Sequence, residues 1–230
     1  MKRSLRFDIL SLFPEYFESP FDVSMIKRAR EKGILEINLV NMRDFASGRY
    51  QQIDDRPYGG GPGMVLMAEP VTKAIRSVKS KKSHVVYLTP QGSPLTAKKC
   101  SELSEKEHLV ILCGHYEGID ERAIVSEVDE EISIGDYVLT SGCPAAIVLV
   151  DSVSRFVPGV IGNEDAAKQD SFENGIFDAP VFTRPPLFEE MEVPEVLQSG
   201  NHAEIEAWRE KTAREKTEQV RPDLIKQITK

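Results

Sequence analysis

Short apolar runs alternate with amphipathic segments along the first two thirds of the chain. The runs are typical of buried strands, and we expect strands at residues 6–13, 35–40, 84–90, 108–114 and 131–135. Helical spacing of apolar residues predicts intervening helices at residues 17–33 (closed by Gly33), 69–78, 95–104 and within 114–123. Strands that alternate with helices predict an α/β domain with a mostly parallel sheet.

The pattern changes after residue 143. Residues 144–156 are apolar nearly all round, which in a helix indicates burial in the core or at a subunit interface, and we favour the interface. Residues 157–192 show weak periodicity, as in a linker or an ordering loop. Asn201 and Glu204 resemble a capping box, so we expect a long helix after Asn201 and a short last helix near 221–228.

Length and cysteine content narrow the protein class. The 230 residues fit one large domain, or one domain with a small appendage. Cys100, Cys113 and Cys143 are odd in number and widely spaced, which predicts neither a disulfide framework nor a zinc site and favours a reducing, cytoplasmic location. Apolar runs are too short to span a membrane, and the N-terminus does not read as a signal peptide.

The net charge of −8 argues against a nucleic-acid-binding protein, but the charge is uneven. Residues 127–192 hold 14 acidic and 3 basic side chains, so basic surface remains available elsewhere. The cluster from Lys73 to Lys82 is either such a surface or a solvated helix end. Lys211, Arg214 and Arg221 are spaced to share one helix face that could contact phosphates.

Candidate chemistry lies in glycine-containing loops. The run GGGPG at 59–63 lacks the preceding apolar strand of a dinucleotide-binding turn, so it either approaches a ligand closely or is only a flexible loop. Three further loops, at 87–92, 113–122 and 132–142, each follow a predicted buried strand. Ligands of α/β sheets bind beyond the carboxyl ends of the strands, so the three loops could form one pocket, although turn chemistry alone would explain any one of them.

A series of ordered motifs resembles the TrmD family of bacterial tRNA (guanine-N1)-methyltransferases, of the SPOUT class. The motifs are PYGGGPGM, YLTPQG, CGHYEGIDER, EISIGDYVL, DSVSRFVPGVIGNE, DSF, TRP, VPEVL, SGNH and RPDL. The resemblance implies an α/β domain with a mostly parallel sheet and a trefoil knot in its C-terminal part, plus a small helical domain. It places the knotted domain at 1–160, a linker carrying the candidate base at 161–185, and a tRNA-binding helical domain at 186–230.

The resemblance also implies S-adenosylmethionine as methyl donor, and N1 of the guanosine immediately 3′ of the anticodon as acceptor. Asp170 would be the general base and Arg155 would stabilise charge on the guanine oxygen. Asp170 follows Glu164 and Asp165, and neighbouring like charges make a carboxylate a better base. The residues expected to bind the cofactor are Tyr87, Leu88, Thr89, Pro90, Gly92, Gly114, Tyr116, Glu117, Gly118, Ile134, Gly135, Asp136, Tyr137, Leu139 and Gly142.

Further expectations from the resemblance are magnesium as a cofactor, tRNA as the partner, and a homodimer in which two subunits build each site. The rival hypothesis is a non-catalytic RNA- or nucleotide-binding protein of the same fold, and the presence of both Asp170 and Arg155 favours the enzyme. The sequence departs from the usual family pattern at His115, Ser141, Cys143, Pro144 and Phe182.

Overall fold

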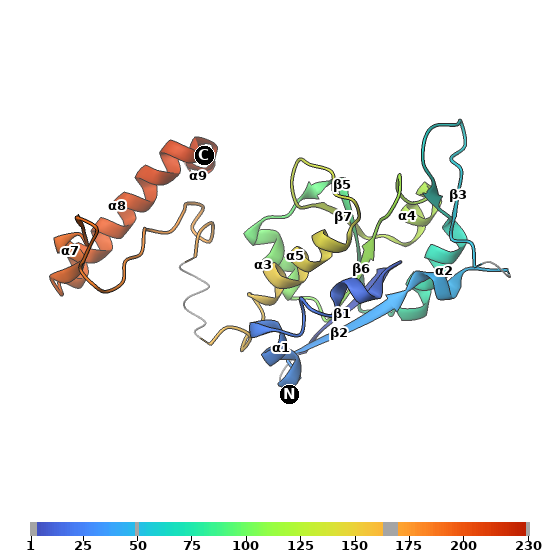
Figure 1. The fold of residues 1–230 in the computed structure, drawn as a ribbon, viewed down its shortest axis with the longest axis horizontal. Coiled ribbons are helices and arrows are strands. Elements are labelled where there is room, and N and C mark those ends of the chain that lie inside the picture. The colour runs from blue at the N-terminus through green and yellow to red at the C-terminus, as the bar shows by residue number, and fades with distance from the viewer. Residues whose placement is uncertain (1–3, 49–50, 163–169, 229–230) are drawn as a thin grey trace. The chain divides into compact units, whose positions relative to one another are not determined.

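The computed structural model describes residues 4–48, 51–162 and 170–228. The chain divides into two compact units, residues 1–162 and 163–230 (Figure 1). No helix within the described ranges is long and apolar enough to cross a membrane.

The first unit is built on a five-stranded sheet in the order β2-β1-β6-β5-β7, in which every neighbouring pair is parallel. This confirms the α/β class with a mostly parallel sheet. The strands are β1 (Leu5–Ser11), β2 (Leu35–Asn41), β5 (Ser83–Pro94), β6 (His108–Cys113) and β7 (Glu130–Ser133). A separate antiparallel pair joins β3 (Asp54–Asp55) to β4 (Val65–Leu66).

Helices cover both faces of the sheet because alternate strand residues are apolar on each side. One buried cluster holds apolar residues of α1, α3 and α5, and a second cluster, containing Val85 and Val110 of the sheet, holds those of α2 and α4. The helices are α1 (Ser24–Glu31), α2 (Ala68–Val78), α3 (Ala97–Ser104), α4 (Glu121–Glu127) and α5 (Cys143–Ser154), with 3-10 turns η1 (Pro14–Phe17) and η2 (Met42–Phe45). Helices α3 and α5 lie side by side (Figure 1).

The helix expected over residues 17–33 is shorter than its apolar pattern. Phe17 belongs to η1, and α1 begins only at Ser24. Pro20 lies between them and lacks the backbone N–H that a continuous helix requires. Phe17 and Phe21 are nevertheless buried. The apolar spacing therefore predicted the core residues correctly, but the predicted start of the helix was wrong.

Helix α5 corrects the interface interpretation of residues 144–156. Ala146 and Leu149 are fully buried and Ala145 nearly so, within the core of their own chain, where α5 packs against α3, β1 and β6. Val148 is 45% exposed. A helix that is apolar on all sides can be buried in the core or at a subunit interface, and the pattern alone does not distinguish the two. Most of α5 lies in the core.

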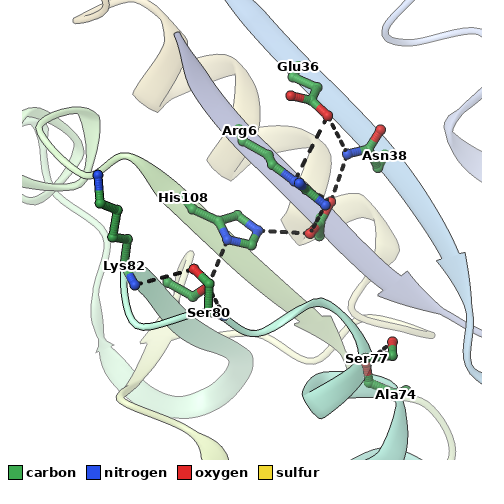
Figure 2. A network of polar contacts seen from close by, with 10 residues as sticks. Arg6, Glu36, Asn38, Ala74, Ser77, Ser80, Lys82 and His108 are labelled. Carbon is green, nitrogen blue, oxygen red and sulfur yellow. Dashed lines mark hydrogen bonds and ion pairs between the residues drawn. The ribbon is translucent and has the colours of Figure 1, made fainter. Parts of the chain in front are cut away.

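A polar network occupies the interior at the amino-terminal edge of the sheet. Figure 2 shows the side chains of Arg6, Asn38 and His108 pointing toward one another. All three donate hydrogen bonds to the Asp8 carboxylate. His108 Nε2 donates to Asp8 at 2.8 Å, and His108 Nδ1 lies 2.7 Å from the Ser83 hydroxyl. Side chains from three strands therefore supply the hydrogen bonds that the buried Asp8 carboxylate needs.

The second unit is mainly helical in its described part. It contains β8 (Leu187–Phe188), β9 (Met191–Glu192), α7 (Glu195–Gln198), α8 (His202–Val220) and α9 (Pro222–Ile228). The Asn201 side chain accepts a hydrogen bond from Glu204 N, which confirms the predicted helix start. Arg221 lies beyond the last residue of α8, so it does not extend the helix face of Lys211 and Arg214 as expected.

Candidate functional site

The three predicted loops meet around one cavity at the carboxyl ends of β5, β6 and β7. Its volume is about 320 Å³, within the ~300–1,000 Å³ typical of small-molecule pockets. Parallel strands bring their carboxyl ends to the same edge of a sheet, which is why segments distant in sequence converge here. Turn chemistry alone would not have gathered the three loops around one cavity.

Most of the expected cofactor-binding residues line this cavity. They are Tyr87, Leu88, Thr89, Pro90, Gly114, Tyr116, Glu117, Gly118, Ile134, Gly135, Tyr137, Leu139 and Gly142. Gly92 and Asp136 are not among the lining residues. Lining residues absent from the expected set are Gln91, His115, Ile132, Ser133, Val138, Thr140, Ser141 and Ala145. All but Ala145 lie in or beside the predicted loops, so including whole loops would have found them; Ala145 belongs to α5 and carried no such signal.

Gly92 supports the cavity through backbone packing. A Cβ atom at this position would lie 2.4 Å from the backbone nitrogen of Ile132. The pairing of β5 with β7 shifts register between Leu88 and Ser93, and the bulged residues 89–91 turn toward the cavity. A glycine at position 92 therefore lets β7 approach closely at the point where the first loop ends.

Backbone contacts hold the second and third loops together. Gly142 N donates to Gly114 O at 2.8 Å, and a Cβ on Gly142 would lie 2.9 Å from Gly114 N. Gly114 also packs on the Tyr87 ring, because a Cβ atom at position 114 would lie 3.1 Å from that ring. Burial raises the pKa of Tyr87, which keeps its hydroxyl protonated at neutral pH. The cavity wall is therefore built from closely packed glycine backbone and one buried aromatic ring.

The glycine-rich run at 59–63 contacts the second loop. A Cβ on Gly63 would lie 2.4 Å from Glu117 Cγ, and Glu117 N donates to Met64 O at 3.0 Å. Leu66 N in turn donates to Gly118 O at 2.9 Å. The run therefore packs closely against Glu117, a cavity residue, and its approach to a ligand stays a prediction.

His115 forms part of the cavity rim with two aromatic neighbours. Its ring lies 5.2 Å from that of Phe13 and 4.8 Å from that of Tyr116, measured between centroids. Burial, followed by the nearby positive charge of Arg43, lowers the pKa of His115. The imidazole is therefore mainly neutral at neutral pH, with one donor and one acceptor nitrogen.

Arg155 lies away from the cavity within its own unit. Gly142 and Ala145 line the cavity at the start of α5, whereas Arg155 caps the other end of this 12-residue helix. At about 1.5 Å per residue the helix separates the two ends by roughly 18 Å. The exposed Arg155 is therefore not brought to the cavity of its own unit.

Asp170 lies in an ordered turn of the second unit. Ser171 bonds to the Asp178 side chain, and Phe172 and Phe177 pack edge to face with centroids 5.7 Å apart. Phe177 N donates to the buried Thr217 hydroxyl of α8 at 2.9 Å. The structure thus anchors the segment that carries Asp170 to α8, while Glu164 and Asp165 lie outside the described residues.

The magnesium expectation receives no support. Among the residues whose positions are described, no group of three or more His, Cys, Asp or Glu side chains is arranged to hold a metal ion. No site and no step is therefore assigned to a metal.

Comparisons with known proteins agree with the motif series. Residues 5–227 match the family model described as tRNA (Guanine-1)-methyltransferase TrmD. The chain is 60% identical over 218 residues to a tRNA (guanine-N(1)-)-methyltransferase of Protochlamydia amoebophila, covering 95% of this chain and 98% of that protein. It is 57% identical to proteins of the same name from Chlamydia muridarum and Chlamydia pneumoniae. The match covers 63% of the length of the first protein and 61% of the second. On this agreement of sequence and family model, the chain belongs to the TrmD family.

Proposed function

We propose that the chain is an S-adenosylmethionine-dependent methyltransferase that acts on N1 of the guanosine immediately 3′ of the anticodon in tRNA. Family membership supports the reaction class, since the relatives are named tRNA (guanine-N(1)-)-methyltransferases. The observation that carries the proposal is the cavity formed by the three strand-end loops. Its mixed wall of aromatic rings, apolar side chains and glycine backbone suits a nucleoside with a short polar chain.

The bound cofactor would supply an electrophilic methyl group. The guanine N1 carries a proton near neutral pH, so a base must remove it during transfer. Asp170 is the proposed base, since its carboxylate accepts protons and its turn is anchored to α8. Arg155 is proposed to stabilise the negative charge that develops on the guanine oxygen as the proton leaves.

The proposed site requires a second copy of the chain. Arg155 and the cavity lie at opposite ends of α5, so Arg155 would act at the cavity of a partner subunit. This geometry, and not the buried residues of α5, is what supports the homodimer.

We also propose the trefoil knot implied by the family. Strand β7 is an edge strand beside β5, yet the chain continues through loop 134–142 to α5, which packs on β6 and β1. The chain therefore returns across the carboxyl end of β5, as a knotted crossing requires.

The C-terminal unit is proposed to contact tRNA. Lys211 and Arg214 of α8 are 73% and 60% exposed at their side chains. Glu215 and Glu218 pair with them one helical turn on, at 3.9 Å and 3.2 Å. Exposed pairs of this kind are weak, so phosphates can replace the carboxylates as partners.

The direct test is transfer of labelled methyl from S-adenosylmethionine to an unmodified tRNA transcript, with nucleoside analysis by mass spectrometry. We expect N1-methylguanosine, and no transfer to a matched transcript with adenosine in place of the target guanosine. Binding of cofactor and tRNA without any transfer would overturn the proposal and support the non-catalytic binding protein.

A further inference from the structure

Two of the three cysteines meet directly behind the cavity. Cys113 is the last residue of β6 and Cys143 is the first residue of α5, and each is 2% exposed. The residues beside them, Gly114 and Gly142, line the cavity and share the 2.8 Å backbone hydrogen bond. A Cβ on Gly142 would lie 3.0 Å from Cys113 Cα, so the backbone that leads into Cys143 packs directly against Cys113.

The two sulfur atoms have different environments. The Ser11 hydroxyl lies 3.2 Å from the Cys143 sulfur, and Cys143 begins a 12-residue helix. The hydrogen bond from Cys113, aided by those from Ser11 and Ser141 and opposed by burial, lowers the pKa of Cys143 to about 6. The same bond, together with burial, raises the pKa of Cys113. Cys143 is therefore the more acidic of the two thiols and the one that reacts as a nucleophile.

We propose that Cys113 and Cys143 form a redox-active dithiol, which a small hydroperoxide such as hydrogen peroxide oxidises to a disulfide behind the cavity. Both thiols are buried behind the cavity wall formed by Gly114, Gly142 and Ala145, so the oxidant has to be small and uncharged, as a hydroperoxide is.

The oxidation balances in two steps. The Cys143 thiolate attacks one peroxide oxygen, the O–O bond breaks, and the departing hydroxide takes up a proton to give water and a sulfenic acid on Cys143. The Cys113 sulfur then attacks the Cys143 sulfur, loses its proton and displaces hydroxide, which leaves as the second water. Two thiols are oxidised to one disulfide, and one peroxide is reduced to two waters.

The disulfide would change the cavity wall. A covalent bond draws the end of β6 toward the start of α5, and Gly142 has no space to move closer because its contacts with Cys113 and Gly114 are already tight. We therefore expect oxidation to displace Gly114 and Gly142 and weaken ligand binding. This consequence rests on the proposed function, whereas formation of the disulfide does not.

Oxidation of the full chain with hydrogen peroxide at neutral pH, followed by alkylation and peptide mapping, tests the pair. We expect a mass lower by two hydrogen atoms and a crosslinked peptide pair containing Cys113 and Cys143. Cys100, which is buried in α3, supplies the matched control. Cys100→Ser should still form the disulfide, whereas Cys113→Ser and Cys143→Ser should not.

Mapping of the wild-type chain needs no variant, so the test holds even where a substitution impairs folding. Failure to find the Cys113–Cys143 crosslink, or a crosslink that involves Cys100 instead, would overturn the proposal.

Cofactor binding before and after oxidation of Cys100→Ser tests the consequence. We expect affinity for S-adenosylmethionine to fall at least 10-fold on oxidation and to return after treatment with dithiothreitol. Equal affinity of the reduced and oxidised forms would overturn the effect on the cavity. Absence of binding by the reduced protein would contradict the proposed function instead, and peptide mapping would still decide whether the dithiol is oxidised.

Discussion

The Asp8 carboxylate accepts a hydrogen bond from His108 Nε2 at 2.8 Å, and the Asp8 side chain is fully buried. The two residues are 100 positions apart in sequence, on adjacent strands: Asp8 lies in the middle of β1 and His108 is the first residue of β6. Arg6 and Asn38 complete the shell of donors around Asp8. The network joins three strands of the sheet at the edge opposite the cavity.

Asp8→Asn should destabilise the first unit by about 1–3 kcal/mol, because an amide offers one acceptor oxygen and leaves donors unsatisfied in the interior. Denaturant unfolding followed by far-UV circular dichroism measures the loss. Glu36→Gln is the matched control: Glu36 contacts Arg6 and Asn38 but is 54% exposed, so its effect should be within about 0.5 kcal/mol. Equal losses of unfolding free energy in the two variants would show that the burial of Asp8 does not determine its contribution to stability.

The stability of the fold should decrease in acid through Asp8. Burial alone would raise the pKa of Asp8, but hydrogen bonds from His108, Arg6 and Asn38 outweigh it and hold the pKa below its ordinary value. This contribution is fully present above the unfolded pKa of about 3.9 and is lost as pH falls through the lower folded value. Melting temperatures between neutral pH and pH ~3 should therefore fall more steeply for the wild type than for Asp8→Asn.

Gly92→Ala should destabilise the fold by about 1–3 kcal/mol and weaken S-adenosylmethionine binding, because its Cβ would meet the backbone of Ile132. Thermal unfolding and calorimetric titration measure the two effects. Gly162→Ala is the control, since a Cβ there has no neighbour within 4 Å and its φ is not positive. Retention of full stability and affinity by Gly92→Ala would contradict the tight β5–β7 approach.

Asp170→Asn should lower methyl transfer by about 100- to 10,000-fold while leaving cofactor affinity nearly unchanged, because it removes the proposed base. Turnover assays and calorimetry on the same preparation separate the two quantities. A parallel loss of cofactor affinity and turnover would identify Asp170 as a structural residue.

Thr217→Val should lower methyl transfer without weakening cofactor binding, because Phe177 N loses its acceptor and the turn that carries Asp170 loosens from α8. A misplaced catalytic group can cost up to about 100-fold in rate. Thr217→Ser keeps the hydroxyl, which also donates to Ala213 O at 2.7 Å, and should restore most of the rate. If valine and serine variants turn over equally fast, this hydrogen bond does not position Asp170.

The sequence by itself predicted the α/β class, the strand ends that surround the cavity, and the start of α8 at Asn201. These features depend on local pattern, since apolar runs, glycine loops and capping residues act over a few positions. The resemblance to a known family supplied the candidate base, its charge-stabilising partner and the knot, none of which periodicity could supply.

Only the tertiary structure decided which buried surfaces and side chains meet. The sequence pattern shows that α5 is apolar but does not show which residues pack against it. In the structure, most of α5 packs against residues of its own chain. Asp8 and His108, and likewise Cys113 and Cys143, come together through strand order and helix packing over long separations in sequence. Such contacts depend on the order of strands in the sheet, β2-β1-β6-β5-β7, which no local pattern of residues encodes.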